Sequence, residues 1–270
     1  MTPHHGQPVS LHYRREGGGA PVTLLHGVGS SLEVWDGVVR ATGENCAVLR
    51  VDLRGHGRSG KPPGPYKLDD FVRDLAGLYE HLGIEQASLV GFSLGGVIAQ
   101  AFALAHPEKV NRLVLISAVA GRTPAEAARV RERARMIREV GARQHAKNSA
   151  GRWFTDGFQK SHPEIIARHF RRFIANDPEA YSAAYQVLAE SDLSGRLTEI
   201  SQPTLIITGE HDIGSTPRMA ELMHQKIARS ELHILPGLKH ALLLEAPAQI
   251  AGLIRQFITP ASIRGRAVGD

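Results

Sequence analysis

Residues 87–96 read Ala-Ser-Leu-Val-Gly-Phe-Ser-Leu-Gly-Gly, and this stretch decides the fold. Its first four residues form a short aliphatic run, which is typical of a strand buried on both faces of a sheet. Residues 94–106 have a helical pattern that stops before Pro107. The sequence therefore predicts a tight strand-to-helix turn with Ser93 at its centre.

Gly91 and Gly95 flank Ser93 in the pattern G-x-S-x-G. Such a turn forces the serine into a strained conformation that exposes its hydroxyl, and the glycines avoid side-chain collisions. The helix N-terminus adds free N–H groups and partial positive charge, which favour a developing oxyanion. We therefore predict that Ser93 is a nucleophile; the alternative is a glycine-rich turn with an incidental serine.

Similar aliphatic runs recur on both sides of this turn, and helical patterns separate them. One such pattern repeats apolar residues from Phe71 to Leu82; Asp69 is expected to cap this helix and Gly83 to end it. This alternation predicts an α/β fold with a mostly parallel, doubly wound sheet. The predicted strands are 22–25, 47–51, 87–90, 113–116, 204–207 and 232–235.

The N-terminal part of the chain departs from this parallel arrangement. Residues 9–15 are expected to form an antiparallel strand at the edge of the sheet. The run Gly17-Gly18-Gly19 separates this segment from the next predicted strand, and its simplest interpretation is a hairpin turn.

Residues 121–194 contain helical signals and no convincing strand. Residues 125–140 are rich in Ala, Arg and Glu, and Thr123-Pro124 resembles a helix N-terminus. We interpret 121–194 as a helical cap inserted into a core formed by 1–120 and 195–258. Residues 259–270 are expected to be a disordered tail.

A nucleophilic serine needs a base, and the base needs an orienting carboxylate. With a serine at this kind of turn, the acid and then the histidine follow it in the chain. Asp212 follows the strand 204–207 and is the predicted acid, with Glu210 as its competitor. His240 lies in a glycine-containing loop after the strand 232–235 and is the predicted base.

An oxyanion hole needs two N–H donors. We predict the backbone N–H of Leu94, directly after the nucleophile, and that of Val28, in the loop after the strand 22–25. His26 opens this loop and His56 lies between two glycines, and we predict structural roles for both.

Composition excludes several other functions. The chain has 270 residues, no apolar run long enough to span a bilayer and no signal-peptide pattern at its start, so we expect a cytoplasmic protein without membrane contact. The single cysteine, Cys46, is expected to be buried. No zinc-ligand spacing or nucleic-acid motif is present, so we expect neither a metal nor a nucleic-acid partner. The oligomeric state is left open.

Charge is distributed unevenly along the chain. Residues 122–172 hold 13 Lys and Arg against 5 Asp and Glu, a net charge of +8 within a chain of net +5. A basic cap over the nucleophile predicts a small anionic substrate, which an arginine can bind through two parallel hydrogen bonds. Arg152 and Trp153 are the candidate substrate-binding residues. Arg168, Arg171 and Arg172 are further candidates, whereas Arg129, Arg133, Arg135 and Arg138 are interpreted as a solvated helix face.

Taken together, these motifs resemble the α/β-hydrolase family over nearly the whole chain, from Val9 to Ile258. The resemblance rests on residues 26–27, 54–57, 91–96 and 209–212 together with His240. It implies the triad Ser93, Asp212 and His240, and the oxyanion donors Val28 and Leu94. It also implies hydrolysis without a cofactor.

Within that family the chain is most similar to 3-oxoadipate enol-lactonases. The closer similarity lies in residues 54–66, 152–155 and 181–193, and it implies cleavage of a carboxylate-bearing enol lactone. Two features differ from what we expect of close enol-lactonases: the oxyanion loop begins His-Gly rather than Ser-Asn, and residues 241–244 are more apolar. Cleavage of an amide or a carbon–carbon bond, a general carboxylesterase and a non-catalytic binding protein remain as alternatives.

Overall fold

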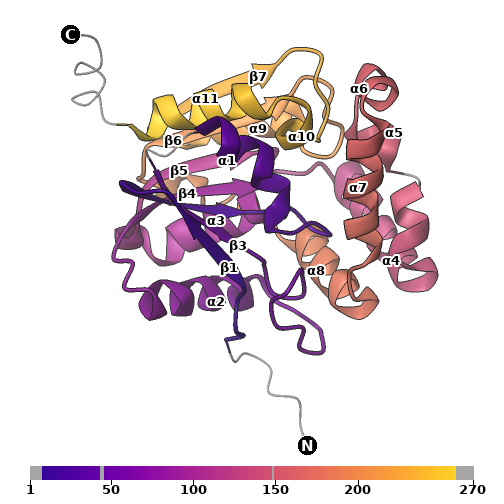
Figure 1. The fold of residues 1–270 in the computed structure, drawn as a ribbon, viewed down its shortest axis with the longest axis horizontal. Helices are drawn as coiled ribbons and strands as arrows, with labels where there is room; N and C mark the ends of the chain where they lie inside the picture. The colour runs from indigo at the N-terminus through magenta and orange to yellow at the C-terminus, as the bar shows by residue number, and fades with distance from the viewer. Residues whose placement is uncertain (1–7, 43–45, 148, 260–270) are drawn as a thin grey trace, which may run out of the picture.

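The computed structural model describes residues 8–42, 46–147 and 149–259. Seven strands form one sheet in the order β1-β3-β2-β4-β5-β6-β7 (Figure 1). All neighbouring strands are parallel except β1 and β3. The predicted doubly wound, mostly parallel sheet is therefore confirmed. The strands are β1 Tyr13–Glu16, β2 Ala20–Leu25, β3 Cys46–Val51, β4 Ala87–Phe92, β5 Val110–Ile116, β6 Thr204–Gly209 and β7 Ser230–Leu235.

The edge of the sheet corrects two expectations. β1 begins only at Tyr13, because the backbone just before it pairs with a loop: the carbonyl of His12 accepts from the N–H of Asp52. The glycine run 17–19 is not a hairpin turn, because β1 pairs antiparallel with β3 rather than with β2. The run instead carries the chain across β3 to the far side of that strand.

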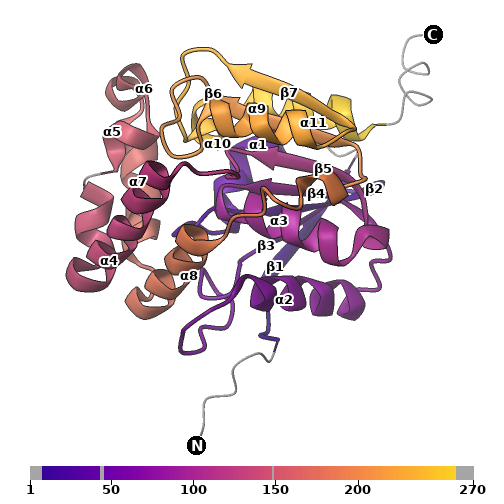
Figure 2. The ribbon, with the colours of Figure 1, turned by 180° about the vertical axis from the view of Figure 1, so that it is seen from behind.

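Helices cover both faces of the sheet (Figures 1 and 2). Buried side chains of α2, α3 and α9 pack on one face, and those of α1 and α11 pack on the other. β4 lies between the two layers and is buried along its whole length. The helices are α1 Asp36–Thr42, α2 Leu68–His81, α3 Leu94–Ala105, α9 Pro217–Lys226, α10 Leu242–Glu245 and α11 Pro247–Ile258.

The start of α2 differs from the prediction. Lys67, not Asp69, occupies the N-cap position. Asp70, three residues further on, accepts a hydrogen bond from the backbone N–H of Lys67 at 2.8 Å. The carboxylate therefore stabilises the helix start from within its first turn, where negative charge is favourable.

In the described part of the chain, five α-helices between β5 and β6 form the cap beside the sheet (Figure 1). Asp192 joins the two ends of this segment, because its carboxylate accepts from the N–H groups of Gly121 and Arg122. We propose the boundaries 121–194 for the cap on this basis. The cap helices are α4 Pro124–Lys147, α5 Ala150–Trp153, α6 Asp156–Ser161, α7 Pro163–Ile174 and α8 Pro178–Glu190.

The sequence also predicted a disordered C-terminal tail and no membrane-spanning segment. Of the tail 259–270, residues 260–270 lie outside the described part of the chain. Within the described part, no helix combines the length and the apolar character that crossing a membrane requires.

Candidate active site

Ser93 lies in the strand-to-helix turn between β4 and α3. Its backbone has φ 54° and ψ −115°, the strained conformation that the motif predicts. The turn is tight: a Cβ on Gly95 would lie 2.4 Å from the carbonyl oxygen of Leu25, and one on Gly91 2.2 Å from that of Gly95. Only glycine fits at both positions, so the turn holds the serine against the end of the sheet.

A buried Asp212 and a half-buried His240 form a pair after β6 and β7. Asp212 Oδ2 lies 2.7 Å from His240 Nδ1, and Asp212 Oδ1 accepts from the N–H groups of Gly214 and Ser215 at 2.9 Å each. Burial alone raises the pKa of Asp212, but the charge and hydrogen bond of His240 outweigh it and hold that pKa below its usual value. An ionised Asp212 therefore orients the imidazole.

Glu210, the competing acid, has a different environment. It is exposed, and its Oε2 accepts from the N–H of Gly237 at 2.8 Å. The described hydrogen bond of the His240 ring is with Asp212, not with Glu210. Glu210 thus stabilises the loop before His240 from the outside.

The two candidate oxyanion donors lie in the loop after β2 and at the start of α3. None of the described hydrogen bonds uses the backbone N–H of Val28 or of Leu94. The peptide that carries the Val28 N–H has a fixed orientation, because its carbonyl, that of Gly27, accepts from His26 Nδ1 at 2.8 Å and from Ser30 N–H at 3.1 Å. Val28 is a lining residue of the cavity described below, and Leu94 directly follows Ser93.

Two buried histidines hold this loop, and both are structural as predicted. His26 Nε2 accepts from the N–H of Leu53 at 3.0 Å, and His56 Nε2 accepts from the N–H of Gly29 at 2.9 Å. Acceptance at Nε2 requires neutral rings. Burial lowers the pKa of His26, and burial followed by the nearby His26 lowers that of His56 to about 3.

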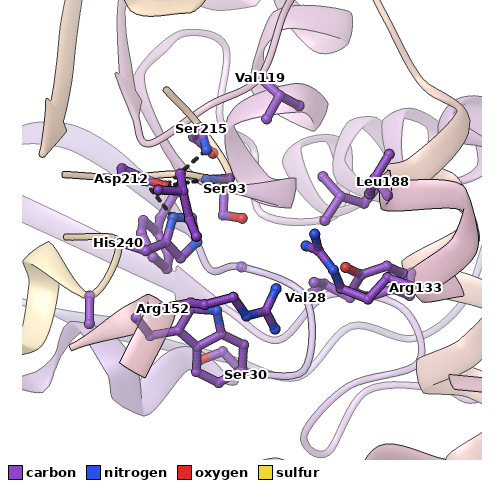
Figure 3. Close-up of a pocket in the computed structure, with 18 of the residues that line it drawn as sticks. Val28, Ser30, Ser93, Val119, Arg133, Arg152, Leu188, Asp212, Ser215 and His240 are labelled. Carbon is purple, nitrogen blue, oxygen red and sulfur yellow. Dashed lines mark hydrogen bonds and ion pairs between the residues drawn. The ribbon is translucent and has the colours of Figure 1, made fainter. Parts of the chain in front are cut away.

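A cavity of about 120 Å³ lies between the sheet and the cap (Figure 3). Ser93, Asp212 and His240 line it from the core. No described hydrogen bond joins Ser93 Oγ to His240, and Figure 3 shows the serine oxygen beside the open space. Half of the other lining residues are apolar: Val28, Val34, Phe92, Val119, Val130, Trp153, Leu188, Ile213, Met219, Ala241, Leu243 and Leu244.

The cap contributes arginines to this cavity, and they differ in part from those expected. Arg152 and Trp153 line it, and so does Arg122. Arg129 and Arg133 line it as well, although the sequence indicated a solvated helix face for both. Arg168, Arg171 and Arg172 are instead exposed and are not among its described lining residues.

A helical spacing could have identified Arg133. Glu126, Arg129, Val130 and Arg133 recur at three- and four-residue intervals, so they share one face of α4. Val130 and the nearby Ala134 are buried. Arg133 thus borders the face by which α4 packs on the rest of the molecule.

Two histidines of the cap were missed. His145 and His169 line the cavity, and burial together with neighbouring arginine charge lowers their pKa values to about 3 and about 4. His169 packs against the aromatic rings of Trp153, Phe154 and Phe170. No pattern in the sequence marks either residue, because their positions depend on how the cap helices pack.

The cysteine and the possible metal ligands of the chain form no second reactive site in the described residues. Cys46 is buried in β3, and burial raises the pKa of its thiol. In the described ranges, no three His, Cys, Asp or Glu side chains cluster as metal ligands would.

Comparison with known proteins agrees with this geometry. A family model described as alpha/beta hydrolase fold matches residues 20–247. The chain is 32% identical over 243 residues to 3-oxoadipate enol-lactonase 2 of Acinetobacter baylyi, which covers 89% of this chain and 90% of that protein. The enol-lactonase from Burkholderia xenovorans superposes with a TM-score of 0.86, at 28% identity over 93% of this chain and 97% of its own. A thermophilic esterase from Thermogutta terrifontis, with malate bound, gives a TM-score of 0.85 at 29% identity over 93% of both chains.

Proposed function

Because this chain belongs to the alpha/beta hydrolase family, we propose that it is a serine hydrolase that cleaves an ester or lactone bond of a small, carboxylate-bearing substrate. One observation carries this proposal: a single cavity is lined by the Ser93 turn, by the Asp212–His240 pair and by arginines of the cap. The Ser93 turn and the Asp212–His240 pair supply a nucleophile and a base for acyl transfer. The arginines favour binding of an anion.

The proposed reaction proceeds through an acyl-enzyme. The Ser93 side chain rotates towards His240, which takes its proton as Oγ attacks the carbonyl carbon. The N–H groups of Val28 and Leu94 stabilise the oxyanion, and Asp212 stabilises the imidazolium. Collapse of the tetrahedral intermediate breaks the carbon–oxygen bond, and the imidazolium returns its proton to the leaving oxygen. Water, deprotonated by His240, then attacks the acyl-enzyme and regenerates Ser93.

The relatives support the substrate class. An enol-lactonase and an esterase are among the proteins that this chain resembles over about nine-tenths of its length. The residues assigned to the reaction are side chains and backbone groups of the chain itself, and no step calls on a cofactor. Within the cap, Arg152 and Trp153 are proposed to contact the substrate.

Replacing Ser93 tests the reaction type. Ser93→Ala should lower kcat by at least about a thousandfold, because the covalent route is lost, while the far-ultraviolet circular dichroism stays unchanged. A fluorophosphonate should label the wild type at Ser93 and leave the variant unlabelled. Hydrolysis by the variant within tenfold of the wild type, in protein free of contaminating esterases, would contradict the proposal.

A pair of matched substrates tests the preference for an anion. A monoester that keeps a free carboxylate should have a higher kcat/KM than the corresponding neutral diester, and added salt should reduce the difference by screening. The measurement is kcat/KM for both esters at 0.05 M and 0.5 M NaCl. An equal or higher value for the neutral ester at both concentrations would favour a general carboxylesterase instead.

A further inference from the structure

We infer that the cap carries a preassembled carboxylate-binding subsite made of Arg133 and Arg152, with His145 and Ser149 holding Arg152 in place. This inference rests on the proposed function, because the subsite shares its cavity with Ser93. In this subsite Arg133 and Arg152 select the anion. Arg133, for which the sequence indicated a solvated face, thus contacts the substrate. It also predicts that the cap binds carboxylates that contain no cleavable bond.

The guanidinium group of Arg152 is held in a fixed position. Its Nη2 donates to Ser149 Oγ at 2.5 Å and lies 3.2 Å from His145 Nε2. Ser149 Oγ in turn donates to the carbonyl of His145 at 2.7 Å, and Tyr181 OH lies 2.8 Å from His145 Nδ1. His145, Ser149 and Tyr181 are all buried, so the arginine is oriented before any ligand arrives.

His145 and Ser149 do not neutralise Arg152. Nε2 of His145 faces the guanidinium as an acceptor, so the ring proton lies on Nδ1 and is donated to Tyr181. Burial, followed by the charges of Arg152 and Arg133, lowers the pKa of His145 to about 3, so the ring is neutral. Ser149 is neutral too, so neither of these two partners cancels the positive charge of Arg152.

Arg133 brings a second positive charge from α4. It lines the same cavity, and in the described part of the chain it has no hydrogen bond or ion pair. Figure 3 shows its guanidinium and that of Arg152 pointing into the space that Ser93 borders. Two like charges therefore line one cavity, and burial, followed by the charge of Arg133, lowers the pKa of Arg152.

The acidic residues nearby on α4 are already paired. Glu126 forms an ion pair with Arg218, and Glu132 and Glu139 both pair with Arg135. The repulsion between Arg133 and Arg152 is therefore not relieved by these carboxylates. An anionic ligand would relieve it, and a carboxylate matches the planar donors of both guanidinium groups.

The rest of the lining limits the ligand. Val130, Trp153 and Leu188 form an apolar part of the cavity wall. A short aliphatic chain fits these walls, with its carboxylate at the arginines and its scissile carbonyl at Ser93. The ligand class is therefore a small aliphatic acid that carries a second carbonyl function a few carbons away.

Binding without turnover tests this subsite. Succinate, glutarate and adipate would be titrated into Ser93→Ala by calorimetry, with adipamide as the neutral analogue of adipate. At least one dicarboxylate should bind, and adipamide should bind at least tenfold more weakly than adipate if adipate is that ligand. Arg133→Gln and Arg152→Gln, each added to Ser93→Ala, should each raise Kd at least tenfold.

Arg131 provides the matched control. It lies on α4 two residues before Arg133, is exposed and is not among the described lining residues. Arg131→Gln removes the same charge and should change Kd less than twofold. Arg133→Lys, which keeps the charge but loses the planar pair of donors, should lie between the wild type and Arg133→Gln. Thermal unfolding of each variant would identify loss of the fold.

The outcomes separate this subsite from the proposed function. No binding of any of the three acids, equal binding of adipamide and adipate, or equal effects of Arg131→Gln and Arg133→Gln would each overturn the subsite. Dicarboxylate binding lost in Arg133→Gln, in a protein whose Ser93 neither reacts with fluorophosphonate nor supports hydrolysis, would uphold the subsite and overturn the serine hydrolase.

Discussion

Asp212 and Glu210 show how much a single residue's surroundings decide. Both follow β6, and only one residue separates them in the chain. Asp212 is buried, accepts two backbone N–H groups and lies 2.7 Å from His240, whereas Glu210 is exposed. A carboxylate orients an imidazole strongly only where water does not compete for it.

The first prediction concerns these two acids. Asp212→Asn should lower kcat by about 10⁴-fold, because the amide stabilises the wrong tautomer of His240 and no longer balances its charge. Glu210→Gln should change kcat less than about threefold, since its hydrogen bond to Gly237 lies outside the cavity. Steady-state kinetics of both variants on one ester measures this. A larger loss in Glu210→Gln would show that the acid is misassigned.

At the scale of elements, the loop after β2 is held from two directions. From the core, His56 accepts from the N–H of Gly29 in this loop, and His26, which opens the loop, accepts from the N–H of Leu53. From the cap, Asn176 Nδ2 donates to the carbonyl of Gly29 at 2.8 Å. The proposed oxyanion donor Val28 thus lies in a loop that core and cap position together, which prepares it for charge that develops only during the reaction.

A second prediction follows for His26. His26→Ala removes the donor to the Gly27 carbonyl and so frees the peptide that carries the Val28 N–H. The value of kcat should fall about tenfold to a hundredfold, while KM changes less than about threefold, because the loss concerns the transition state. A boronic acid, which forms a tetrahedral adduct with an active-site serine, should lose affinity by a similar factor.

Two further variants define the role of His26. His26→Asn can still donate to the Gly27 carbonyl and should recover part of kcat. His224→Ala, at an exposed histidine near the end of α9, serves as the control. An unchanged kcat and boronate affinity in His26→Ala, accompanied by a lower Tm, would show that His26 stabilises the fold without positioning the oxyanion donor.

For the whole molecule, buried histidines make folding sensitive to acid. Burial is the largest cause that lowers the pKa values of His56 and His145 to about 3 and that of His169 to about 4. In the unfolded chain these three histidines are protonated near pH ~6.5, whereas in the folded chain they are protonated only near pH 3–4. Between these values the unfolded state binds more protons, so stability falls as pH falls.

The third prediction is the size of this effect. Each of the three histidines should reduce the free energy of unfolding by about 2 kcal/mol between pH 7 and pH 5. Urea unfolding at both pH values measures the total. His169→Phe should make the difference between the two pH values smaller by about the contribution of one histidine, and His211→Gln, at an exposed position, should leave it unchanged. Equal stability of the wild type at pH 7 and pH 5 would contradict the prediction.

The sequence alone determined the strand-to-helix turn, the sheet and the positions of Ser93, Asp212 and His240. Each of these residues lies in the turn or loop that follows a predicted strand. Parallel strands end at one edge of a sheet, so a local pattern is enough to place their following loops together. The sequence did not indicate that β1 pairs with β3. An edge strand can pair with either outer strand of the sheet, and its own residues do not select between them.

Only the tertiary structure decided which side chains of the cap meet the cavity. Arg131 and Arg133 are two residues apart on α4, yet only Arg133 is a described lining residue. A helix turns about 100° per residue, so the spacing groups the residues of one face, but the rotation of the helix against the core decides which face lines the cavity. The bracing of Arg152 by His145 depends equally on the packing of α4, α5 and α8. Local sequence thus placed the proposed catalytic residues, whereas long-range packing decided what surrounds the space they share.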